Sequence, residues 1–158
     1  MLAGFAQNGA KKLSLCDYSY RRRRTLAPQR CLRICYDPIL LAEDEQATRE
    51  YLARALERSG YDVVAVDRGT AAAPLLEQEH FDLLLTDIVM PEMDGIELAR
   101  HCNRVSPGTE VMFITGFSGV ALRASASMPS AKILSKPFHL KDLVLEVERL
   151  FAKESFGE

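Results

Sequence analysis

The sequence has no tryptophan, only three histidines and four cysteines, and no long run of apolar residues. No stretch approaches the roughly 20 apolar residues that a membrane-spanning helix requires, and no apolar segment follows a basic start as in a secretory signal. The cysteines form no C-x-x-C pair and the histidines are scattered, so zinc-ligand spacing is absent and reduced thiols are expected. We therefore expect a cytoplasmic protein with no membrane partner.

Positive charge is scarce in most of the chain and concentrated at its start. The net charge is -2, yet residues 1–36 carry eight Lys or Arg and a single acid, whereas residues 37–158 carry twelve Lys or Arg and 21 acids. Residues 1–36 show no helical or strand periodicity, and no aromatic interleaving or folded nucleic-acid motif accompanies the arginines at 21–24. We expect residues 1–36 to be a basic, disordered extension, with no nucleic-acid partner, and residues 37–154 to form one domain.

From residue 38 onward, short apolar runs alternate with amphipathic segments. The runs lie at 39–42, 63–66, 83–86, 111–114 and 133–134, and the amphipathic segments at 47–56, 69–76, 95–104, 118–127 and 140–151. The runs do not alternate with polar residues, which is typical of parallel strands buried on both faces. Five strands alternating with five helices predict an α/β doubly wound sandwich. Pro74 is compatible with the second helix only in its first turn.

Polar residues follow four of the five predicted strands. Glu43 and Asp44 follow the first strand, Asp87 the third, Thr115 the fourth and Lys136 the fifth. Parallel strands bring these ends to one crevice, where three carboxylates would repel each other unless a divalent cation such as Mg²⁺ and a lysine relieved the repulsion. Asp87 is then a candidate nucleophile towards phosphorus, with Thr115 as a hydrogen-bond donor to a phosphoryl oxygen.

Four segments that contain these residues resemble the receiver domain of two-component response regulators. They are Leu-Leu-Ala-Glu-Asp at 40–44, Thr-Asp-Ile-Val-Met-Pro-Glu-Met-Asp-Gly at 86–95, Phe-Ile-Thr-Gly at 113–116 and Lys-Pro-Phe at 136–138. The resemblance implies a flavodoxin-like (βα)5 fold with a five-stranded parallel sheet of order 2-1-3-4-5. It also implies a histidine kinase or a histidine phosphotransfer protein as the phosphodonor.

The same resemblance implies a role for each site residue. Asp87 corresponds to the phosphoacceptor, Asp44 to the direct Mg²⁺ ligand, and Glu43 to the acid that holds the ion through water. The backbone carbonyl of Val89 corresponds to a further metal ligand. Thr115 corresponds to the switch hydroxyl.

The last segment that resembles the family follows the fifth predicted strand. The strand itself contains one departure from the family pattern. Lys136 corresponds to the phosphate-pairing lysine, and the Lys136-Pro137 bond resembles the family's usual cis peptide. Most receivers have an aromatic residue three positions before this lysine, whereas this chain has Ile133. We therefore expect the signal to travel by repacking of Ile133 or of the loop after Thr115, with an order–disorder change in residues 116–130 as our hypothesis.

A second departure concerns the lifetime of the phosphorylated state. Val89 and Phe117 lie two residues past Asp87 and Thr115, at positions that flank the phosphoryl group in the family and that can orient the attacking water. Apolar side chains cannot orient water, so the sequence predicts slow self-dephosphorylation. Apart from this reaction and the Mg²⁺-dependent acceptance of a phosphoryl group, we expect a signalling switch and not an enzyme.

The expected output is binding of a partner protein, because only seven residues follow Phe151. Residues 84–100, together with Phe-Ile-Thr-Gly-Phe and Lys-Pro-Phe-His-Leu, resemble the CpdR-like single-domain regulators of alphaproteobacteria. That resemblance implies a phosphorylation-gated adaptor for ClpXP proteolysis in cell-cycle control, active when unphosphorylated, with ClpX and its substrates as partners. The alternative is a phosphorelay shuttle that passes the phosphoryl group to another histidine protein.

Two further classes fit the pattern less well. A haloacid-dehalogenase-like phosphohydrolase carries its D-x-D motif after the first strand, where this chain has Glu43-Asp44. A flavin carrier of similar topology needs a Ser/Thr-rich phosphate loop at the same place, and acids there would repel the flavin phosphate. Both classes are therefore disfavoured.

Overall fold

The structure is a computed structural model that describes residues 37–154. The predicted basic extension, residues 1–36, lies outside the described residues. Strands and helices alternate along the described chain as β1 (Pro38–Ala42), α2 (Gln46–Arg58), β2 (Asp62–Val66), α3 (Gly69–Gln78), β3 (Leu83–Asp87), α4 (Gly95–Val105), β4 (Glu110–Thr115), α5 (Ser118–Ser127), β5 (Lys132–Ser135) and α6 (Leu140–Glu154).

The strands form one parallel sheet of order β2-β1-β3-β4-β5, which confirms the predicted fold class. The chain runs from β1 to the edge strand β2 and then returns to β3, on the other side of β1. The strand order therefore reverses between β1 and β3, and the ends of these two strands flank the crevice where ligands bind in sheets of this type. Ala42 near the end of β1 is in register with Thr86, the residue before Asp87 in β3.

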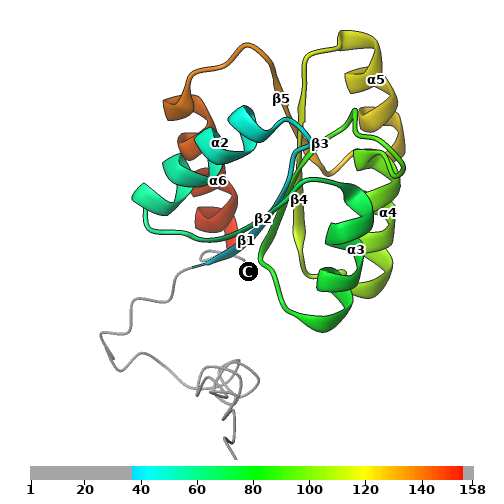
Figure 1. The fold of residues 1–158 in the computed structure, drawn as a ribbon, viewed down its shortest axis with the longest axis horizontal. Helices are drawn as coiled ribbons and strands as arrows, with labels where there is room; N and C mark the ends of the chain where they lie inside the picture. Colours follow the sequence, from blue (N-terminus) through cyan, green and yellow to red (C-terminus); the bar gives the residue numbers. More distant parts are fainter. Residues whose placement is uncertain (1–36, 155–158) are drawn as a thin grey trace, which may run out of the picture. The chain divides into compact units, whose positions relative to one another are not determined.

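Helices cover both faces of the sheet, with α2 and α6 on one face and α3, α4 and α5 on the other (Figure 1). The three central strands are buried along almost their whole length, and the edge strands β2 and β5 are only half-buried. This burial explains why the central runs are apolar without alternation, as predicted for strands that are covered on both faces.

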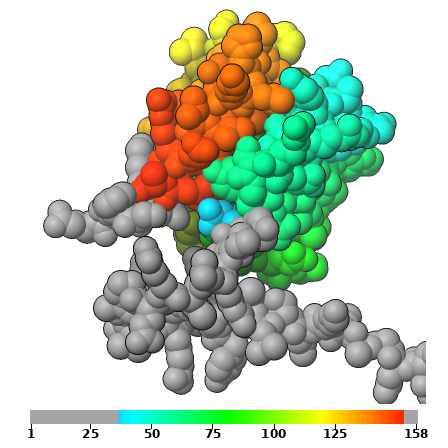
Figure 2. Space-filling model, turned by 90° about the vertical axis from the view of Figure 1, so that its left-hand side faces the viewer, coloured from blue at the N-terminus to red at the C-terminus, as the bar shows by residue number. Residues whose placement is uncertain are grey.

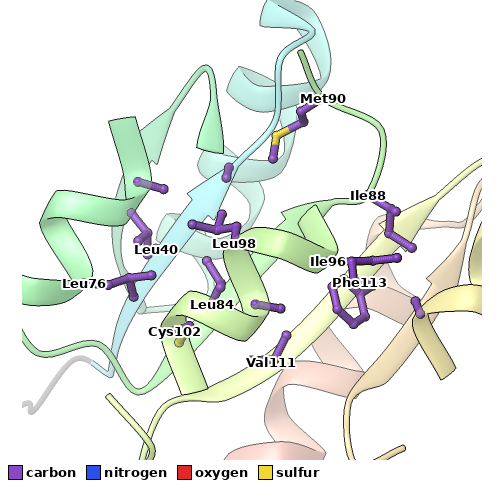
Figure 3. Close-up of a cluster of buried hydrophobic side chains, with 14 of the residues drawn as sticks. Leu40, Leu76, Leu84, Ile88, Met90, Ile96, Leu98, Cys102, Val111 and Phe113 are labelled. Atoms are coloured by element: carbon purple, nitrogen blue, oxygen red, sulfur yellow. The ribbon is translucent and has the colours of Figure 1, made fainter. Parts of the chain in front are cut away.

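Two hydrophobic clusters fill the space between the sheet and its helices. The cluster beneath α3, α4 and α5 includes Leu40, Leu84, Leu98 and Phe113, and it extends to Met90 in the loop after β3 (Figure 3). The second cluster lies beneath α2 and α6, whose outer surfaces adjoin each other in Figure 2. Both clusters rest on the same strands, so the C-terminal ends of β1, β3 and β4 are fixed from two sides.

The prediction that Pro74 lies in the first turn of its helix is wrong. α3 begins at Gly69, so Pro74 is the sixth residue of the helix. Proline has no N–H, and the carbonyl of Thr70, four residues earlier, therefore lacks its helical donor. Thr70 is exposed, so water can bond to this carbonyl, and the helix continues past the proline.

Between residues 37 and 154, no helix is both long enough and apolar enough to cross a membrane.

Candidate functional site

Three acidic side chains meet at the C-terminal edge of the sheet, where the strand order reverses. Glu43 and Asp44 follow β1 directly, and Asp87 is the last residue of β3. One carboxylate oxygen from each lies within 4.8 Å of the others. The sequence prediction that these three residues come together is confirmed by this geometry.

Lys136, which follows β5, reaches across the sheet to the acids. Its ammonium donates a hydrogen bond of 2.7 Å to Asp87 Oδ2 and one of 3.0 Å to Glu43 Oε2. The peptide bond between Lys136 and Pro137 is cis, as the sequence resemblance implied. The Lys136 N–H also donates to the carbonyl of Thr115 at 2.7 Å, so the backbone that carries the lysine is bonded to the end of β4.

Thr115 and Val89 lie at the same edge and contact the site in different ways. Thr115 is buried at the end of β4, and its hydroxyl accepts the N–H of Phe117 at 3.2 Å. Within residues 37–154 this hydroxyl makes no hydrogen bond to Asp87. The N–H of Val89 donates to Asp87 Oδ1 at 3.0 Å, while the side chains of Val89 and Phe117 are exposed.

The loop between Asp87 and α4 folds back tightly on the end of β3. Gly95, the first residue of α4, donates its N–H to the carbonyl of Ile88 at 2.9 Å. A Cβ atom at Gly95 would lie 2.1 Å from the carbonyl oxygen of Asp87, so only glycine permits this approach. Asp94 accepts the N–H of Glu97 at 2.8 Å as the N-cap of α4, which fixes where the loop ends.

The charges of the site do not balance. Glu43 is 1% exposed, and burial raises its pKa, with repulsion from Asp87 and Asp44 adding to the effect and Lys136 opposing it. Burial alone would lower the pKa of Lys136, but its hydrogen bonds to Asp87 and Glu43 outweigh burial and raise this pKa. Three carboxylates therefore face one ammonium group, and the cluster keeps an excess of negative charge.

The donor set fits a hard divalent cation. Carboxylate oxygens are the ligands that Mg²⁺ prefers, and Mg²⁺ is commonly bound by one or two carboxylates with water completing its shell. Asp44 is exposed, so the cluster is open to solvent on one side. The repulsion that raises the Glu43 pKa is the kind that a cation between the acids removes.

Arg49 is a residue of this site that the sequence reasoning missed. It lies in the first turns of α2, and its Nη1 donates to the carbonyl of Glu43 at 2.7 Å and to that of Asp44 at 3.1 Å. One guanidinium nitrogen thus holds the backbone of both acids. The available signal was its position five residues after the acid pair, on the helix that the acids precede.

Replacing Glu43 with glutamine tests the electrostatic description of the site. Glutamine keeps the shape of the side chain and removes a charge whose burial is unfavourable. In Mg²⁺-free buffer at pH 7, we expect E43Q to raise the melting temperature by about 2–4 °C. The measurement is thermal unfolding of native protein and variant in the presence of a chelator.

The pH dependence of that difference supplies the control. Because the Glu43 pKa is raised in the folded state, the folded protein takes up this proton before the unfolded chain does, and stability from this group rises as the pH falls. The advantage of E43Q should therefore shrink as the pH approaches 4.5, the ordinary glutamate value. E57Q, which changes an exposed acid on α2, should behave like the native protein at every pH. A lower melting temperature for E43Q at pH 7 would contradict this description.

Comparison with known sequences identifies relatives of the chain. A family model described as the response regulator receiver domain matches residues 39–148. The response regulator receiver protein CpdR of Brucella abortus is 56% identical over 113 residues, which are 71% of this chain and 94% of CpdR. The sensor kinase CckA of the same organism is 36% identical over 121 residues, which are 73% of this chain but only 13% of the kinase.

Solved structures agree with the sequence matches. The receiver domain of the hybrid histidine kinase CckA has a TM-score of 0.62 and 31% identity, covering 72% of this chain and 97% of that domain. A response regulator receiver protein from Sinorhizobium medicae has a TM-score of 0.70 and 29% identity, covering 76% of this chain and 98% of that protein. The sheet order, the acid cluster with its lysine and these matches lead to one conclusion: the chain belongs to the response regulator receiver family of two-component signalling proteins.

Proposed function

We propose that Asp87 is the phosphoacceptor of a two-component system or phosphorelay, with a histidine kinase or a histidine phosphotransfer protein as the donor. The observation that carries this proposal is the pair of hydrogen bonds from Lys136 to Asp87 and Glu43 at the C-terminal edge of the sheet. These bonds place a cation beside a carboxylate that has two further acids close by. Phosphoryl transfer requires mainly positioning and charge neutralisation, which such a site provides.

The metal of this site is proposed to be Mg²⁺. Glu43, Asp44 and Asp87 would hold the ion, and by the family resemblance the carbonyl of Val89 would join them. When bound, Mg²⁺ neutralises negative charge on the phosphoryl oxygens. Arg49 keeps the backbone of the two acids after β1 in place through its bonds to their carbonyls.

The transfer itself needs few groups of the protein. An oxygen of the Asp87 carboxylate attacks phosphorus, and a P–O bond forms as the P–N bond of the donor phosphohistidine breaks, with its electron pair staying on the imidazole. Lys136 is already bonded to Asp87 and pairs with the phosphoryl oxygens. The Thr115 hydroxyl, which now accepts the Phe117 N–H, donates to one of these oxygens.

Incubation with acetyl phosphate and Mg²⁺ tests the central proposal. We expect intact mass to show one phosphoryl adduct on the native protein and none on D87A, because the variant lacks the nucleophile. D62N, which changes an exposed acid on β2, is the matched control and should be modified like the native protein. Absence of the adduct on the native protein would refute the assignment of Asp87.

The phosphorylated state is proposed to be long-lived. The exposed side chains beside the site, Val89 at 48% and Phe117 at 63%, are apolar and offer no group to orient water towards the acyl phosphate. We propose that this slow self-dephosphorylation is the only reaction that the protein catalyses besides accepting the phosphoryl group. The chain is then a signalling switch and not an enzyme in the usual sense.

Substituting Val89 with asparagine tests this proposal. An amide at this position can orient water, so we expect V89N to lose its phosphoryl group about tenfold faster, below the 10²–10⁴ of a positioned general base. The rate is followed by intact mass after removal of acetyl phosphate, with Mg²⁺ present. V105N changes another exposed valine, at the end of α4, and should keep the native rate. Loss of the group from native protein within seconds would contradict the proposal.

The structural response to phosphorylation is proposed to involve Ile133 and the loop after Thr115. Ile133 is half-buried on β5, where it packs against the cluster beneath α5 together with Val120 and Met128. Any displacement of Thr115 acts on β5 directly, because the carbonyl of Thr115 accepts the N–H of Lys136. Repacking of Ile133 and a change of order in residues 116–130 would transmit the signal to the surface of α5.

The output of the switch is proposed to be that of a CpdR-like adaptor for ClpXP proteolysis in cell-cycle control. The support is the 56% identity to CpdR of Brucella abortus over 94% of that protein. A partner can be lost between relatives that share a fold, so this step needs its own test. The proposed partners are ClpX and the substrates that ClpXP degrades.

A binding experiment with purified ClpX tests the adaptor proposal. We expect unmodified native protein and D87A to bind ClpX, and native protein treated with acetyl phosphate and Mg²⁺ to bind at least about tenfold more weakly, a difference of about 1.4 kcal/mol. D87A treated in the same way should bind as before, because it cannot be modified. No binding of either form to ClpX, with return of the phosphoryl group to a histidine phosphotransfer protein, would favour a phosphorelay shuttle.

A further inference from the structure

The loop that follows the phosphoacceptor strand is bonded to the N-terminus of α3. Glu92, in this loop, has a φ angle of 67°, in the left-handed region that residues with a side chain seldom adopt. Its Oε2 accepts a hydrogen bond of 2.9 Å from the hydroxyl of Thr70, and its Oε1 lies 3.8 Å from Nη1 of Arg68. A backbone conformation of this kind persists only where the surrounding structure holds it in place.

The carboxylate of Glu92 also places a negative charge near the N-terminus of α3. The N-cap residue Arg68 makes no side-chain cap, and the first turn of α3 contains no acidic residue. A negative group near a helix N-terminus is stabilising, because the backbone N–H groups there carry partial positive charge. Glu92 supplies that group from a loop 22 residues away, so the helix and the loop hold each other.

Gly69 sets how closely the loop approaches α3. A Cβ atom at Gly69 would lie 2.7 Å from the carbonyl oxygen of Met93 and 3.0 Å from its Cβ atom. Gly69 is buried, so a side chain there could not turn away into solvent. At Gly108, by contrast, a Cβ atom would meet nothing within 4 Å.

The same loop is closed at its other end onto the phosphoacceptor. The N–H of Val89 donates to Asp87 Oδ1, and the N–H of Gly95 donates to the carbonyl of Ile88. The loop is therefore a short closed turn, with Val89 on the side of the acid cluster and Glu92 on the side of α3. If Glu92 moves, the loop must adjust between its contacts with α3 and its bonds at Asp87 and Ile88. This part of the loop includes the backbone of Val89.

We propose that the N-terminus of α3 positions the loop of residues 88–94, which links Asp87 to α4 and contains the Val89 carbonyl. In this proposal Gly69, Thr70 and Glu92 are positioning residues that set the orientation of the Val89 carbonyl and of the Asp87 carboxylate towards Mg²⁺. The inference rests on the proposed function. It assigns the positioning of the metal ligands to a helix that supplies no ligand itself. Groups that orient a metal ligand without touching the metal commonly change its affinity when they are removed.

The test is Mg²⁺ affinity of the full chain, measured by isothermal titration calorimetry with the ion alone. We expect G69A to raise the Mg²⁺ dissociation constant about tenfold, the lower end for groups that orient a metal ligand. T70V should raise it about threefold, because it removes one exposed hydrogen bond. T70S keeps the hydroxyl and should restore native affinity, and G108A is the matched control for an added methyl group.

Thermal unfolding in chelator separates positioning from general stability. T70V and T70S should unfold within about 2 °C of each other, since surface substitutions change stability little, while their Mg²⁺ affinities differ. If G69A fails to fold, the T70V and T70S pair decides the matter alone. If T70V binds Mg²⁺ with the same affinity as the native protein, and G69A does so too where it folds, this inference is overturned. The proposed function would then remain intact. Absence of Mg²⁺ binding by the native protein would overturn both.

Discussion

The hydrogen bonds from Lys136 to Asp87 and Glu43 join parts of the chain that are 49 and 93 residues apart. They form only if β1, β3 and β5 run parallel in one sheet and end at the same edge, so the site depends on the topology of the whole domain. In return, the ammonium opposes the repulsion among three acids at the centre of that edge. The cluster still carries excess negative charge. This edge of the sheet therefore has an unfavourable charge distribution that a bound cation would reduce.

The sequence was sufficient to predict the fold and the meeting of the main site residues. Central parallel strands are buried on both faces, so they appear as continuous apolar runs, and the residues that end them are easily recognised. The crevice of a doubly wound sheet lies at those ends, so the sequence predicts that Glu43, Asp44, Asp87 and Lys136 are neighbours, as they are in the structure. Topology and residue type together contained this information.

Other contacts could not be predicted, for reasons that are physical. Arg49 bonds to backbone carbonyls. Every residue has a carbonyl, so the sequence does not indicate which carbonyls accept such a bond. The contact of Glu92 with Thr70 depends on a left-handed backbone angle in a loop and on the approach of a helix from another part of the chain. Pro74 was misplaced because local propensity disfavours proline beyond the first turn of a helix, whereas α3 continues through it.

The burial of the acids gives the site an inner and an outer end. Glu43 is enclosed, Asp44 is exposed, and the apolar side chains of Val89 and Phe117 stand in solvent next to Asp87 and Thr115. If Asp87 accepts a phosphoryl group as proposed, the donor protein would approach past these two side chains and cover their apolar surface. Under that proposal, recognition of the donor and the reaction would share one small area, and a substitution of Val89 or Phe117 would alter both the choice of donor and the lifetime of the phosphorylated state.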